Sequence, residues 1–224
     1  EIHERLVGSE MCIRDSDWAY HRLNDDHKPT DAMKFGTAFH AYLLGTSDVV
    51  SLPEGESFRS KDNQKWRADQ LEAGNIIVSY NDMQLLKRMK EGIEQTSLMP
   101  EYPDYMEIIE QGTKEQCIEW KDRQTGLMLK AKPDLIPAGT DYLVDLKTAQ
   151  KADAESFAKE VINYGYHIQT VFYRAAVAAC KPDAFDRGSK APSTMQFWVF
   201  EKTDACDWPV SYTHLRAHET LMNL

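Results

Sequence analysis

Apolar residues recur at the spacing of a helix in the first half of the chain. Residues 31–44 carry an apolar stripe with this period, and Gly45 follows as a stop signal. Further along, residues 62–73 predict a polar helix, and Asn81 is placed to cap another helix that continues through Ile93. The apolar positions of the first stripe are Met33, Phe35, Phe39, Leu43 and Leu44.

Short apolar runs bounded by turn residues predict strands in the middle of the chain. We expect strands over residues 115–120, 127–133 and 142–147, with turns at Gly126 and Gly139 between them. Such short connections are typical of an antiparallel meander.

Two helical segments and a last strand complete the pattern. The helices are expected over residues 153–162 and 166–180, and the strand over residues 195–201. Strands followed by helices and one more strand predict an α/β (α+β) fold, with a mixed sheet flanked by helices. In the second helix, the positions expected to face inward are Ile168, Val171, Phe172, Ala175, Ala176 and Ala179.

Charged residues stand at or near the ends of the predicted strands. They are Glu115, Asp134, Asp145 and Lys147. Residues two apart in a strand point to the same face, so Asp145 and Lys147 project together into a region that Asp134 can reach. Two converging carboxylates repel each other unless a cation lies between them, and oxygen ligands suit Mg²⁺ or Mn²⁺. A lysine beside such a cation can orient a water molecule or stabilise charge on a phosphate.

Composition narrows the class of protein. The 224 residues fit one domain, and no apolar run is long enough to cross a bilayer. The formal net charge of −10 argues against a protein that coats nucleic acid non-specifically. It does not exclude DNA as a substrate, since carboxylates that bind metal count as negative here. The chain has four widely spaced cysteines and no CxxC pair: Cys12, Cys117, Cys180 and Cys206. This spacing argues against a zinc or iron–sulfur site and predicts reduced thiols in a cytoplasmic protein.

The two ends of the chain fit poorly with the rest. Residues 6–16 (LVGSEMCIRDS) and 210–220 (VSYTHLRAHET) have no clear helical or strand period. Both resemble peptides that arise when sequencing-adapter DNA is translated. We therefore expect residues 17–209 to be a single domain truncated at both ends, with residues 1–16 and 210–224 as non-native tails.

A longer motif covers the charged residues. Residues 130–173 contain Pro133-Asp134, then Asp145-Leu146-Lys147, then the segment NYGYHxQxxxY, and the segment FGTxFH lies upstream. Together these resemble the nuclease domain of RecE-type exodeoxyribonuclease VIII, a member of the PD-(D/E)xK superfamily. The resemblance implies a restriction-endonuclease-like fold: a mixed β-sheet flanked by helices.

The resemblance also implies roles for individual residues. Lys147 matches the catalytic lysine, and Gln169 and Tyr173 match a QxxxY helix that lines the site. Glu115 matches an acidic residue that binds a second metal or positions water. The implied metal ligands are Asp134, Asp145, the Leu146 carbonyl, His40 and Glu115.

The function implied is a Mg²⁺-dependent exodeoxyribonuclease that degrades linear double-stranded DNA from 5′ to 3′ in recombination. Mn²⁺ is an alternative cofactor. The expected partners are double-stranded DNA ends, a single-strand annealing protein and further copies of the chain in a ring-like homo-oligomer. Two alternatives stay open: a non-catalytic DNA-end-binding module on the same fold, and an endonuclease of the same superfamily.

Overall fold

The computed structural model describes residues 29–122, 125–179, 192–202 and 210–212, without side chains for the last three. Chain contacts divide the molecule into a small unit, residues 1–34, and a large unit, residues 35–224. The large unit contains the sheet and every predicted site residue. The predicted tail at residues 1–16 lies outside the described residues. Of the predicted tail at residues 210–224, residues 213–224 lie outside them too, and residues 210–212 form a strand.

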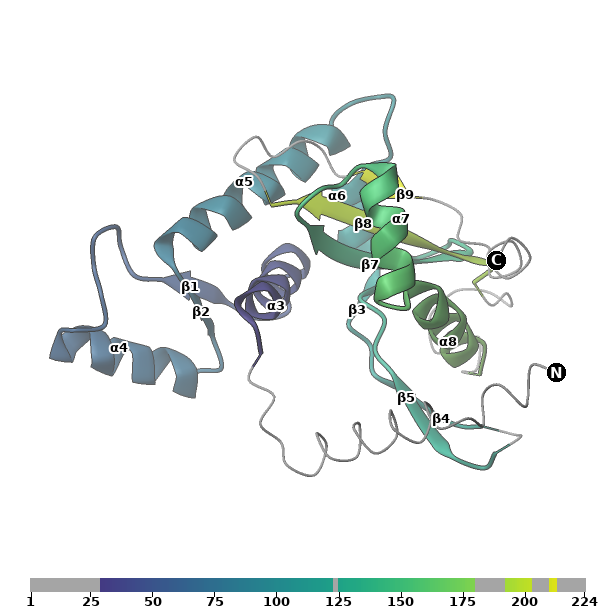
Figure 1. Cartoon of the computed structure of the whole chain (residues 1–224), viewed down its shortest axis with the longest axis horizontal. Helices are drawn as coiled ribbons and strands as arrows, with labels where there is room; N and C mark the ends of the chain where they lie inside the picture. The colour runs from purple at the N-terminus through teal and green to yellow at the C-terminus, as the bar shows by residue number, and fades with distance from the viewer. Residues whose placement is uncertain (1–28, 123–124, 180–191, 203–209, 213–224) are drawn as a thin grey trace. The chain divides into compact units, whose positions relative to one another are not determined.

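A five-stranded mixed sheet forms the centre of the large unit (Figure 1). Its strand order is β3-β6-β7-β8-β9. β7 and β8 pair in parallel along eight residues and are the long central strands of the sheet. The other pairs in this sheet are antiparallel. The strands are β3 (Thr113–Lys114), β6 (Leu135–Ile136), β7 (Tyr142–Ala149), β8 (Thr194–Glu201) and β9 (Val210–Tyr212).

Two smaller pairs of strands stand apart from this sheet. One is the parallel pair β1 (Val49–Ser51) and β2 (Ile76–Val78), and the other is the antiparallel hairpin β4 (Ile118–Lys121) and β5 (Met128–Ala131). The predicted meander is therefore wrong in one respect. β4 and β5 do pair, but the antiparallel partner of β7 is the short β6, which begins directly after Asp134.

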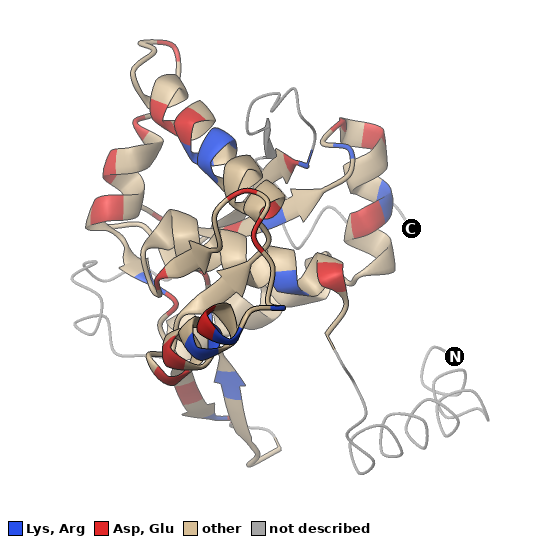
Figure 2. Ribbon diagram, turned by 90° about the vertical axis from the view of Figure 1, so that its left-hand side faces the viewer, with Lys and Arg blue, Asp and Glu red and all other residues tan. Residues whose placement is uncertain are grey.

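Helices cover both faces of the large sheet. One face packs on α3, α5 and α6 through Leu146 and Trp198, and the other packs on α7 and α8 through Leu143 and Phe197. Acidic and basic residues are spread along both α4 and α5 (Figure 2). The helices are α3 (Asp31–Leu44), α4 (Lys61–Glu72), α5 (Tyr80–Ser97), α6 (Tyr105–Gln111), α7 (Ala154–Asn163) and α8 (Tyr166–Ala179).

Local sequence signals explain where several helices begin and end. α3 has the predicted bounds, and Gly45 ends it in a left-handed conformation with φ 67°. Asp153 caps α7 by accepting a hydrogen bond from Ser156 N at 2.9 Å. The predicted cap of α5 is wrong, because Ser79 rather than Asn81 occupies this place and accepts from Asp82 N at 3.1 Å.

Two further predictions need correction. The strand expected from residue 115 begins only at Ile118. Glu115 has a φ of 46°, which ends the extended conformation between β3 and β4. In α8, Ile168 and Val171 are exposed rather than inward, and so are Ala175 and Ala179. A single helix packs on a sheet through one narrow stripe, which here contains Thr170, Ala176 and Val177.

Candidate active site

The site lies where the sheet splits beside β7. The short β6 pairs with β7 only at Leu135 and Val144, whereas β8 follows the whole of β7 on its other edge. Val144 and Leu146 point their main-chain groups to the same edge, because strand residues two apart share a direction. The N–H and carbonyl of Leu146 therefore have no strand partner on that edge. Side chains form hydrogen bonds with them instead.

Asp134 and His40 fill this gap. The Leu146 N–H donates to Asp134 Oδ2 at 2.8 Å, and His40 Nε2 on α3 lies 2.9 Å from the Leu146 carbonyl oxygen. The other ring nitrogen of His40, Nδ1, is 3.4 Å from Asp134 Oδ1. The side chains of His40 and Asp134 keep 23% and 13% of their surface exposed, so both are mostly but not fully buried at this edge.

Asp145 and Lys147 lie on the face of β7 that is covered by α7 and α8. The Asp145 side chain is 1% exposed, and its Oδ2 is 2.6 Å from Lys147 Nζ. Gln169 on α8 joins the two residues, because its Nε2 donates to Asp145 Oδ1 at 2.7 Å while its Oε1 accepts from Lys147 Nζ at 3.2 Å. The predicted pairing of Asp145 with Lys147 on one face is thus what the structure shows.

The charges of the site influence one another. Burial raises the pKa of Asp145 to about 7, and the charge of Asp134 adds to this, while Lys147 and His40 oppose it. Burial lowers the pKa of His40, but the hydrogen bond and charge of Asp134 outweigh it, so the pKa is raised overall. Burial also raises the pKa of Tyr173, and the charges of Asp145 and Asp134 raise it further, whereas the hydrogen bond with Gln169 lowers it.

The donors in this gap fit a small divalent cation. Asp145 Oδ2 is buried, and its partner among the described residues is the ammonium group of Lys147, at 2.6 Å. Adjacent ligands of an octahedral Mg²⁺ ion lie about 3 Å apart, since each ligand is about 2.1 Å from the ion. His40 Nε2 and the Leu146 oxygen are 2.9 Å apart, but in the structure they form a hydrogen bond with each other. Asp134 and Asp145 would add the carboxylate oxygens that such an ion prefers.

These side chains are not gathered as a ready-made cluster. In the part of the chain that the structure describes, no group of three or more His, Cys, Asp or Glu residues is arranged to hold a metal ion. The carboxylates instead engage protein donors: Asp134 the Leu146 N–H, and Asp145 the Gln169 amide and the Lys147 ammonium. A cation would have to displace some of these contacts.

Glu115 is not brought into this group. Its carboxylate Oε2 lies 2.7 Å from Lys132 Nζ, and only its main-chain N–H reaches toward the site, donating to the carbonyl of Asp134 at 2.8 Å. The left-handed conformation of Glu115 turns the chain here. A role for Glu115 in binding a second metal or positioning water stays a prediction.

Two aromatic residues at the site were not among the predicted ones. Lys147 Nζ lies 4.2 Å from the centre of the Tyr166 ring and 6.0 Å from that of Phe197. Such contacts between an ammonium group and a ring face are attractive. A signal for Tyr166 was present in the NYGYHxQ segment. Phe197 is placed by its pairing with Asp145 across the parallel strands, which the sequence of either strand does not reveal.

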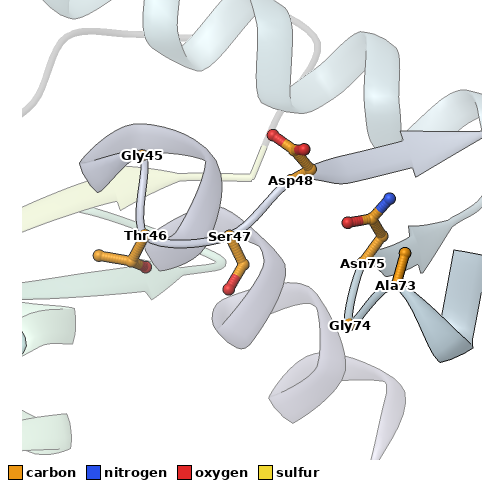
Figure 3. A pocket seen from close by; sticks show the side chains of 7 residues that line it. All are labelled: Gly45, Thr46, Ser47, Asp48, Ala73, Gly74 and Asn75. Atoms are coloured by element: carbon orange, nitrogen blue, oxygen red, sulfur yellow. The ribbon is translucent and has the colours of Figure 1, made fainter.

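A separate hollow of about 370 Å³ lies away from these residues, at the ends of α3 and α4 (Figure 3). It is lined by residues 45–48 and 73–75, among which Asp48 is the one with an ionisable side chain. It contains none of the predicted site residues, so we do not regard it as the active site.

The sheet with a split beside its central strand, two acidic residues and a lysine at that split, and helices on both faces define a PDDEXK-like fold. Comparison with family models agrees: residues 15–207 match the PDDEXK-like domain of unknown function (DUF3799). Because the match covers most of the chain, the protein belongs to this family.

A solved structure supports the same fold. The chain resembles the crystal structure of a protein from Eubacterium rectale that carries the name "Putative exonuclease", with a TM-score of 0.53 and 17% sequence identity. The match covers 91% of this chain and 67% of that protein. No curated protein matches the sequence. None of the described helices has the length and apolar character to cross a membrane.

Proposed function

We propose that this protein is a Mg²⁺-dependent exodeoxyribonuclease that degrades linear double-stranded DNA. The observation that carries the proposal is the buried Asp145 carboxylate, which pairs with Lys147 Nζ at 2.6 Å, on the strand where the Leu146 N–H donates to Asp134. The preference for DNA ends, the 5′ to 3′ direction and a role in recombination are supported by the resemblance to RecE-type exodeoxyribonuclease VIII. The name of the Eubacterium rectale protein supports exonuclease activity alone.

The residues of the site divide the work of phosphodiester hydrolysis. A divalent cation held by Asp134, Asp145, the Leu146 carbonyl and His40 would polarise the scissile phosphate and supply a more acidic water molecule. The ammonium group of Lys147 would offset charge that develops on the phosphate and help to orient the attacking water.

Neighbouring residues would keep these groups in place. Gln169 holds Lys147 and Asp145 through one amide, and the Leu146 N–H fixes the Asp134 carboxylate. Residues that orient ligands in this way commonly matter for metal affinity and activity.

Digestion of end-labelled duplex DNA tests the proposal. The wild-type protein should release nucleotides from linear duplex only when Mg²⁺ or Mn²⁺ is present, and the 5′ label should appear first. Lys147→Ala and Asp134→Ala should abolish release. Lys159→Ala is the matched control, since Lys159 is an exposed lysine that pairs with Glu155 on its own helix.

The alternatives give different results in the same assay. A binding module would retain linear DNA without releasing nucleotides, and an endonuclease would also cut covalently closed circles. Full activity of Lys147→Ala with Mg²⁺ present would refute the proposed chemistry.

A further inference from the structure

The turn between α7 and α8 presents large apolar side chains to solvent. Tyr164 is 69% exposed, Ile168 64% and Ile162 57%. Single exposed apolar residues are common on protein surfaces, but several together within one turn indicate a surface that is covered by a ligand or partner.

This surface is continuous with the candidate active site. The Tyr164 ring stacks on the Tyr166 ring, with centroids 5.7 Å apart and planes at 29°, and Tyr166 in turn lies 4.2 Å from Lys147 Nζ. Gly165 joins the two tyrosines with a φ of 68°, a conformation that other residues rarely adopt. A row of two rings thus leads from the lysine to the exposed surface.

The chemistry of the row indicates what it contacts. Phosphate groups are held by cations and N–H donors, whereas aromatic and aliphatic side chains suit the flat face of a nucleobase. Inside a duplex both faces of every base pair are covered by neighbours, and only the terminal pair has a free face. An aromatic surface next to a phosphate-cleaving site is therefore matched to a DNA end.

On this basis, which rests on the proposed function, we propose that Tyr164, supported by Ile168, stacks against the terminal base of the DNA end whose phosphate lies at Lys147. Tyr166 serves as a spacer between the two, since its ring contacts both the Tyr164 ring and Lys147 Nζ and is held by Phe157 and Phe197. The surface would make the enzyme prefer ends with an intact terminal base.

Fluorescence of a terminal 2-aminopurine tests this contact without hydrolysis. In EDTA, the wild-type protein should quench 2-aminopurine at the end of a duplex and leave an internal 2-aminopurine unchanged. Tyr164→Ala should weaken binding to the end about tenfold, since stacking on an aromatic residue contributes about 1–3 kcal/mol per base. Tyr164→Phe keeps the ring and should behave as wild type, and Tyr102→Ala, which removes another exposed tyrosine, should do the same.

Steady-state digestion gives a second measurement. Tyr164→Ala should raise KM for linear duplex about tenfold and leave kcat unchanged, and a substrate with an abasic terminal residue should remove the difference between variant and wild type.

Equal quenching by wild type and Tyr164→Ala would overturn this inference. If light scattering without DNA also gave an altered molar mass for Tyr164→Ala, the surface would instead be a contact between copies of the chain. Activity of Lys147→Ala would instead refute the proposed function, and the two failures are distinguishable because quenching is measured without cleavage.

Discussion

Asp145→Asn has an effect on stability that follows from the burial of one carboxylate. In protein without metal, burial raises the pKa of Asp145 from 3.8 to about 7. At about 1.36 kcal/mol per pH unit between these values, ionised Asp145 costs the folded state about 4 kcal/mol above pH 7. The attraction of Lys147 is already contained in that pKa, so it needs no separate correction.

The sign of the pH dependence follows from the direction of the shift. Because the pKa is higher in the folded protein than in the unfolded chain, this contribution to stability is complete below about pH 4 and is lost as the pH rises to about 7. Asp145→Asn has no carboxylate to ionise. With EDTA present, the variant should therefore be more stable than wild type at about pH 8, by up to about 4 kcal/mol, and the difference should shrink toward about pH 4.

Urea unfolding monitored by circular dichroism, in EDTA and across this pH range, measures the difference. The pKa of His40 is also raised, so His40 too lowers the stability of the folded protein as the pH rises. A His40→Gln variant therefore serves as the control, because it retains the contribution of Asp145. Mg²⁺ should then stabilise wild type and not Asp145→Asn. A variant less stable than wild type at every pH, or a difference that does not depend on pH, would refute the reasoning.

Three further substitutions separate structural from catalytic roles. Gly112→Ala should lower the free energy of unfolding by about 1–3 kcal/mol in urea titrations, because a Cβ there would lie 2.5 Å from Leu135 Cδ1 and 2.8 Å from the Ile108 oxygen; unchanged stability would mean that this contact relaxes freely. Gln169→Leu should slow DNA digestion about 10–100-fold, as expected when a residue that orients two site groups is lost, and full activity would exclude that role. Glu115→Ala should keep digestion and change stability by about 1 kcal/mol or less, since its carboxylate pairs with Lys132, whereas lost digestion would support the second-metal role.

The sequence predicted most of the elements because their signals are local. The apolar stripe of α3, the stop at Gly45 and the two helices expected over residues 153–162 and 166–180 depend on signals within a few residues, and the structure has α3, α7 and α8 at these places. Asp145 and Lys147 could be placed on one face because strand geometry alone requires it.

What the sequence could not predict depends on contacts between distant segments. The short pairing of β6 with β7 opens the sheet at Leu146, and nothing in either strand specifies where it stops. The outward direction of Ile168 depends on which stripe of α8 meets the sheet, since both stripes are apolar enough to be buried. Glu115 has a left-handed conformation, which is unusual for a residue other than glycine. Nothing in the sequence signals this conformation, so Glu115 was expected to lie in a strand.

The central claim is that one divalent cation binds in the gap beside β7, next to Lys147. Anomalous diffraction from crystals grown with Mn²⁺ tests it most directly. We expect a peak within coordination distance of Asp134, Asp145 and the Leu146 carbonyl oxygen. Crystals in which Mn²⁺ occupies other sites and leaves this gap without a peak would contradict the claim.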